Sequence, residues 1–147
     1  MSNKFNEKQP RSISKVVSWR IIMTISHVIN GLLVSGSIAI AAQIAGMAAI
    51  INSVLFWIHE RVWNRIEWKR EQNQKIKFNE KQPRTISKVV SWRIIITISN
   101  FAIPFFTTGD YTKALAFMTI ATFVNMGLYW VHERVWNRVI WGKTVEE

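Results

Sequence analysis

Four long apolar stretches alternate with charged segments along the chain. They cover residues 16–34, 37–58, 89–108 and 112–131. Each has roughly the 20 residues that an α-helix needs to cross ~30 Å of hydrocarbon. The mean hydropathy of +0.09 hides this pattern, because the charged segments offset the apolar ones. The pattern predicts four transmembrane helices, at about residues 12–35, 37–66, 85–108 and 110–139.

The same sequence occurs twice. Residues 4–68 recur as residues 77–141 at a constant offset of 73, and the segments KFNEKQPR, KVVSWRII and HERVWNR appear in both copies. Similarity at a fixed period indicates one structural unit per copy. We therefore predict an all-α integral membrane protein with two domains, residues 1–73 and 74–147, each of which is a helical hairpin.

A glycine followed by a polar residue marks the turn of each predicted hairpin. Gly36 and Gly109 stand where the first helix of a pair must end, and glycine readily adopts the positive φ that such an end requires. Ser37 and Asp110 follow as N-caps of the second helix. The turns are therefore short.

The distribution of charge separates a membrane protein from a soluble, basic helical bundle. The net charge of +10 would by itself allow nucleic-acid binding. Of the 19 Lys and Arg residues, however, only Lys113 lies in a turn between two paired helices. This is the positive-inside pattern, so we predict a multi-pass protein of the bacterial inner membrane with both termini in the cytoplasm, and no nucleic-acid partner.

Tryptophan follows the same boundary. An indole at the membrane interface buries its ring and keeps its N–H near water. We predict that all eight tryptophans are interfacial anchors: Trp19, Trp57, Trp63, Trp68, Trp92, Trp130, Trp136 and Trp141. Together with the basic residues, they predict contact with anionic head groups of the bilayer.

The two copies have the same predicted orientation, since each unit crosses the membrane twice. Such a parallel repeat has a pseudo-twofold axis along the membrane normal, unlike the inverted repeats of many transporters. It is typical of a single hairpin that once assembled as a symmetric oligomer. We therefore expect a homo-oligomer or a complex with other membrane subunits.

Two sequence blocks carry a resemblance to a known family. One block is Trp-Arg with a later threonine, at Trp19, Arg20 and Thr24 and again at Trp92, Arg93 and Thr97. The other is WxHERVW, at residues 57–63 and 130–136. Over both repeats the chain resembles a family of small prokaryotic two-helix membrane proteins classed as a domain of unknown function. The resemblance implies a membrane location and brings no activity, substrate or cofactor.

Polar residues within the apolar stretches are the candidates for function, because an ionisable group in a bilayer costs a few kcal/mol. Arg20, Thr24 and His27 share one helix face in copy one. Asn52 lies as far after Gly36 as Arg20 lies before it, namely 16 residues. We predict that the arginine of each hairpin bonds the asparagine and reaches toward the glutamate. The predicted buried polar cluster contains Arg20, Thr24, Asn52, His59, Glu60, Arg93, Thr97, Asn125, His132 and Glu133.

This cluster has two open interpretations. It could only lock each hairpin at its depth, or it could attract an anion or relay protons, since histidine titrates near neutral pH. We predict no metal site, because Trp63 and Trp136 stand where the second His of an HExxH motif would be, and cysteine is absent. His27 is matched by Asn100, so an interhelical hydrogen bond is expected there.

No pattern of an active site is found in the sequence. A nucleophile with its base, a phosphate-binding glycine-rich loop and a paired-carboxylate site are all lacking. We therefore expect no enzyme, no catalytic residues and no cofactor. An oligomeric channel or transporter for ions or a small anion is the preferred function, and a structural or accessory subunit of a larger membrane assembly is the alternative.

Overall fold

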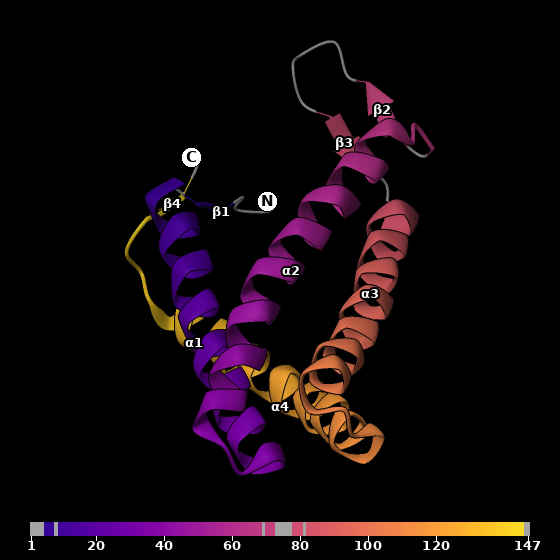
Figure 1. Cartoon of the computed structure of the whole chain (residues 1–147). Coiled ribbons are helices and arrows are strands. Elements are labelled where there is room, and N and C mark those ends of the chain that lie inside the picture. Colours follow the sequence, from indigo (N-terminus) through magenta and orange to yellow (C-terminus); the bar gives the residue numbers. More distant parts are fainter. Residues whose placement is uncertain (1–4, 8, 69, 73–77, 81, 146–147) are drawn as a thin grey trace.

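In the computed structural model the chain forms two helical hairpins (Figure 1). The structure describes residues 5–7, 9–68, 70–72, 78–80 and 82–145. The helices are α1 (Gln9–Ser35), α2 (Ile38–Arg65), α3 (Gln82–Thr108) and α4 (Tyr111–Arg138). The strands are β1 (Phe5–Glu7), β2 (Arg70–Gln72), β3 (Phe78–Glu80) and β4 (Lys143–Val145).

The turn of each hairpin has the predicted chemistry. Gly36 and Gly109 adopt positive φ values of 70° and 67°. The Ser37 hydroxyl accepts a hydrogen bond from the amide of Ile40, and the Asp110 carboxylate accepts from amides in the first turn of α4. Both features satisfy backbone groups that a helix end would otherwise leave unpaired. The predicted glycine and N-cap roles are confirmed.

Helices α1 and α3 begin at Gln9 and Gln82, ahead of the predicted starts near residues 12 and 85. Pro10 and Pro83 lie in the first turn. Proline is tolerated there because its missing N–H would have had no intrahelical partner. The helices therefore extend through the proline and include the arginine that follows it.

The four helices form a ring in which each helix packs against two others. Helix α1 packs against α2 and α4, and α3 packs against α4 and α2. Two short antiparallel strand pairs, β1 with β4 and β2 with β3, join the end of one hairpin to the start of the other. Both pairs lie at one end of the molecule, and both hairpin turns lie at the opposite end (Figure 1). These strands are not among the predicted elements.

The buried apolar core lies near the hairpin turns. It consists of Ile44, Ala48, Ile103, Phe117 and Ala121. Ile44 and Phe117 occupy equivalent positions in the two repeats, 73 residues apart. The core therefore gathers around the pseudo-twofold axis that relates the hairpins.

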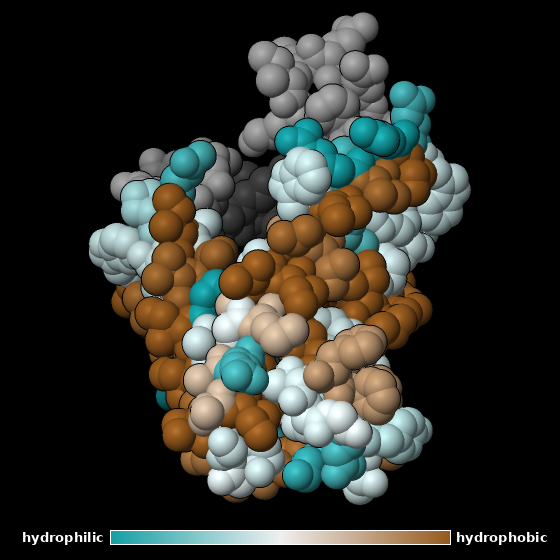
Figure 2. All heavy atoms as spheres, in the orientation of Figure 1, coloured by the Kyte–Doolittle hydropathy of each residue, from teal (hydrophilic) through white to brown (hydrophobic). Residues whose placement is uncertain are grey.

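Much of the outer surface is apolar. Hydrophobic side chains cover the long faces of the helices, and hydrophilic residues gather near the strand-bearing end (Figure 2). By length and composition all four helices are suited to cross a membrane. The predicted fold class, an all-α membrane protein of two hairpins, is confirmed.

Candidate functional site

The predicted polar residues pair between hairpins rather than within them. The Asn52 Oδ1 atom accepts a hydrogen bond from the Ser99 hydroxyl at 2.6 Å. The Glu60 carboxylate forms an ion pair with Lys88 at 3.1 Å. Arg20 is exposed, and among the described residues it contacts neither of its two predicted partners. The structure therefore does not bring the arginine, asparagine and glutamate of one hairpin together.

A buried arginine at the start of α1 holds the end of α4. The Arg11 side chain is fully buried. Its guanidinium donates to the backbone carbonyls of Trp136 at 2.6 Å, Val139 at 2.8 Å and Trp141 at 2.6 Å, and it lies over the Trp136 ring. The last carbonyls of a helix lack intrahelical partners and carry partial negative charge, so a cation is favourable there.

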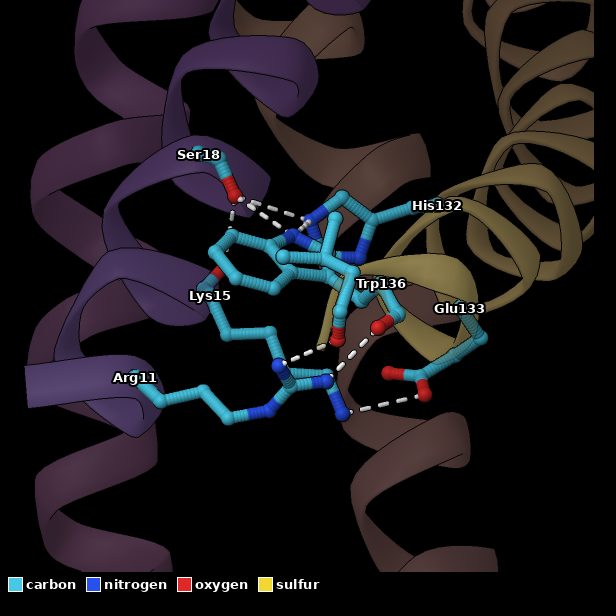
Figure 3. Close-up of polar contacts among 7 residues, drawn as sticks. Arg11, Lys15, Ser18, His132, Glu133 and Trp136 are labelled. Carbon is cyan, nitrogen blue, oxygen red and sulfur yellow. Dashed lines mark hydrogen bonds and ion pairs between the residues drawn. The ribbon is translucent and has the colours of Figure 1, made fainter. Parts of the chain in front are cut away.

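Further contacts between α1 and α4 complete this arrangement (Figure 3). Lys15 pairs with Glu133 at 3.0 Å, and the Ser18 hydroxyl and His132 Nε2 are 2.9 Å apart. The Trp136 indole N–H lies within hydrogen-bonding distance of both Ser18 Oγ and His132 Nε2. We call this set the first clamp: Arg11, Lys15, Ser18, His132, Glu133 and Trp136.

The second clamp repeats the first between α3 and α2. The Arg84 guanidinium is fully buried and donates to the carbonyls of Trp63, Ile66 and Trp68. Each acceptor is 73 residues before its counterpart in the first clamp. The remaining members are Lys88 with Glu60, and Ser91 with His59 and Trp63. The two clamps are therefore equivalent contacts, related by the pseudo-twofold symmetry of the hairpins.

Each clamp contains a serine–histidine pair, and the structure describes no third group at the other ring nitrogen. His59 Nδ1 and His132 Nδ1 are buried and have no hydrogen-bond partner in the described part of the chain. A catalytic imidazole is held at this atom by a carboxylate or an equivalent acceptor. Each pair is therefore a packing contact between helices.

Below the clamps, toward the hairpin turns, all four helices contribute buried polar side chains. We call these six residues the polar layer: His27, Asn30, Asn52, Ser99, Asn100 and Asn125. Asn100 occupies the position in copy two that His27 occupies in copy one, and both side chains are buried in the layer. The interhelical hydrogen bond expected at His27 stays a prediction.

Several atoms of the polar layer have no partner. His27 Nε2, Asn30 Oδ1 and Asn125 Oδ1 are buried without a hydrogen bond among the described residues. The Asn30 amide N–H donates to the Phe117 carbonyl at 3.1 Å, which fixes the orientation of this side chain. The His27 ring stacks on the Phe117 ring, and the two ring centroids are 5.8 Å apart. An unsatisfied polar atom is expensive in a membrane interior, so these atoms mark a candidate binding site.

The tryptophans divide into two groups. Trp57, Trp68, Trp130 and Trp141 are exposed, and the first and third of these lie beneath the guanidinium groups of Arg61 and Arg134. Trp19, Trp63, Trp92 and Trp136 are half-buried against the clamps. The second group therefore has a packing role beyond the predicted anchoring.

The structure adds residues that sequence reasoning missed. Arg11 and Arg84 belong to the basic segments and were interpreted only as topology signals. The available signal was their recurrence directly after a proline at a helix start. Among the described residues, no cluster of His, Cys, Asp or Glu could hold a metal ion.

Comparisons with known proteins identify the family. No curated protein and no solved structure matches the chain. A family model described as a predicted membrane protein matches residues 13–64 and again residues 86–137, so each hairpin carries one match. The chain therefore belongs to the DUF2061 family of membrane proteins, as a tandem member with two copies of the family unit.

Proposed function

We propose that the protein transports a small cation or protons across the bacterial inner membrane and that the polar layer is the site of passage. Three buried polar atoms carry this proposal, because they have no hydrogen-bond partner among the described residues: His27 Nε2, Asn30 Oδ1 and Asn125 Oδ1. Inside hydrocarbon each such atom costs several kcal/mol unless something binds it.

The chemistry of these atoms favours a cation or a hydrogen-bond donor. Asparagine Oδ1 only accepts hydrogen bonds, and one of the two N–H donors of the Asn30 amide already bonds the Phe117 carbonyl. A small anion would need donors, and the arginines that suggested an anion, Arg20 and Arg93, are exposed outside the layer. His27 is the titratable member of the layer, so protons are the first substrate to test.

Passage would require movement of the core. The His27 ring stacks on Phe117, which packs with Ile44 on the side of the hairpin turns. Filled cores of this kind do not conduct by diffusion, because protein interiors are close-packed. The proposal is therefore a slow, conformationally coupled transporter, which an oligomer would support better than one chain.

Proton flux into proteoliposomes tests the proposal. The protein is reconstituted with a pH-sensitive dye inside the vesicles, and a potassium gradient with valinomycin drives proton entry. We expect flux well above that of empty vesicles and at least tenfold lower flux with His27→Asn. That variant should fold, because asparagine occupies the equivalent position 100. Ser53→Ala is the matched control, since Ser53 bonds only its own helix, at the Ala49 carbonyl. Wild-type flux equal to that of empty vesicles would refute transport of protons.

A structural or accessory role is the second candidate, because the core at the pseudo-twofold axis is filled. Under this alternative the layer only joins helices, as the Asn52–Ser99 hydrogen bond does. Native mass spectrometry of gently extracted protein distinguishes the two functions. A homo-oligomer favours transport, whereas a stable complex with an unrelated membrane protein favours the accessory role.

The proposed topology places the strand-bearing end in the cytoplasm. The concentration of basic residues at that end supports it. Since the chain has no cysteine, Glu67→Cys and Thr112→Cys provide single labelling sites at opposite ends. In intact spheroplasts a membrane-impermeant maleimide should label only the cysteine at position 112.

A further inference from the structure

Two arginines inside the predicted spans have exposed side chains. Arg20 in α1 and Arg93 in α3 are exposed, and neither guanidinium group has a hydrogen bond or an ion pair among the described residues. Their neighbours Ile21 and Ile94 are 55% and 57% exposed. These arginines therefore project from an apolar surface, where an ionised guanidinium needs an anion or water.

The arginine side of α1 is the side that packs on α2 near the hairpin turn. A Cβ atom added at Gly31 would lie 3.0 Å from the Ala41 Cα, so the two helices touch there. Thr24 and Arg20 lie 7 and 11 residues before Gly31. At about 100° per residue, these positions share one helix face within about 20°. Because this face is buried at Gly31 and exposed at Arg20, α1 and α2 must diverge toward the strand-bearing end.

Copy two has the same arrangement. Pro104, which occupies the position of Gly31, is fully buried, whereas Arg93 is exposed on the same face. The Thr24 and Thr97 hydroxyls donate to the carbonyls of Arg20 and Arg93 and so do not compete for the guanidinium groups. The chain thus presents two equivalent cationic positions.

The level of Arg20 identifies the anion. Trp19 packs edge-to-face on Tyr129 of α4, with ring centroids 5.5 Å apart. Arg20 and the exposed Trp130 directly follow these two residues, so they lie at a similar level along the bundle. Exposed aromatic residues mark the depth of the lipid head groups. Glu133 lies three residues after Trp130 in α4, and its carboxylate is already paired with Lys15. Phosphate is the remaining anion at this depth.

We propose that Arg20 and Arg93 each bind a phosphate group, which in the membrane is the phosphodiester of an anionic phospholipid. The guanidinium offers several N–H donors in a geometry that suits phosphate. The surrounding basic residues attract anionic head groups over zwitterionic ones. One chain therefore carries two equivalent lipid sites, independent of any transport through the polar layer.

Native mass spectrometry in mixed lipid tests the proposal. The full chain is released from nanodiscs of equal phosphatidylglycerol and phosphatidylcholine. We expect the wild type to retain up to two phosphatidylglycerol molecules, R20L to retain one, and R20L/R93L to bind at least tenfold more weakly. The matched control is R61L/R134L, because Arg61 and Arg134 are equally exposed and cationic but lie over tryptophan rings. This control should change binding less than twofold.

The outcomes separate the possible anions. Millimolar inorganic phosphate should leave the bound lipid in place; displacement by phosphate would identify a soluble phosphate site and overturn the lipid assignment. Unchanged lipid retention in R20L/R93L would overturn the proposal. So would a loss of oligomer without loss of lipid, because the arginines would then pair with a second copy. If R20L/R93L does not fold, R20Q/R93Q is measured with the same expected loss.

Discussion

Replacing Arg11 by methionine removes the centre of the first clamp while nearly preserving its volume. The fully buried guanidinium donates to the carbonyl of Trp136 in the last turn of α4 and to those of Val139 and Trp141 just after it, at 2.6–2.8 Å. Methionine cannot donate to any of them. The Trp136, Val139 and Trp141 carbonyls would therefore lose a charged donor, and the contact between α1 and the end of α4 would loosen.

The expected loss follows from the count of hydrogen bonds. A hydrogen bond to a charged group contributes about 1.5–3 kcal/mol. Three of them do not add fully, because burying the cation carries a desolvation cost that the variant avoids. We expect Arg11→Met to lower the free energy of unfolding by roughly 3–5 kcal/mol. The stability of Arg11→Lys should lie between those of the wild type and Arg11→Met, because one ammonium group cannot match the planar fork of guanidinium donors.

The loss of unfolding free energy is measured by adding SDS to the protein in mixed micelles and monitoring unfolding by tryptophan fluorescence. Arg84→Met should have a similar effect, because Arg84 makes the same contacts on α2. Arg138→Met is the control, since Arg138 is exposed in the last turn of α4, and it should change stability by under about 0.5 kcal/mol. Equal losses for Arg11→Met and Arg138→Met would refute the role of the clamp.

Three further substitutions test the helix contacts by the same unfolding assay. Gly31→Val should destabilise by about 1–3 kcal/mol, because its Cβ would lie 3.0 Å from the Ala41 Cα; no loss would mean that α1 and α2 do not touch there. Asn52→Leu should cost only about 0.5–1.5 kcal/mol, since hydrogen bonds such as that to Ser99 are weak between membrane helices; a loss above about 4 kcal/mol would contradict this. Gly36→Ala should cost about 1–2 kcal/mol because φ is 70°, and a stabilised variant would disprove the reasoning about the turn.

Local sequence signals were sufficient to predict the helices. The apolar stretches set their number and approximate length, and Gly36 and Asp110 marked the turns, since each of these features depends on near neighbours in sequence. The strands were not predictable by the same means. A three-residue strand has too few positions to show alternation, and its partner lies at a distant point of the chain, as β1 with β4 illustrates.

The internal repeat concealed the pairing of the polar residues. Glu60 and Glu133 stand in identical local sequences. The sequence therefore does not show whether Lys15 pairs with Glu60 of its own repeat or with Glu133 of the other. The prediction also placed Arg20 and Asn52 together by assuming that the paired helices stay adjacent along their whole length. They diverge instead, so Asn52 meets Ser99 of α3 and Arg20 remains exposed.

The differences between the repeats separate assembly from activity. All six positions of the clamps are identical in the two copies, for instance Arg11 with Arg84, as expected for contacts that hold two hairpins together in a symmetric way. In the polar layer and in the apolar core the copies differ: His27 corresponds to Asn100, and Ile44 corresponds to Phe117. A homodimer of single hairpins would have to place two identical residues at each such position, which forbids a lone histidine on the axis. Fusion of the hairpins removes that restriction, so the tandem chain has a single histidine in its polar layer, which a homodimer of one hairpin could not have.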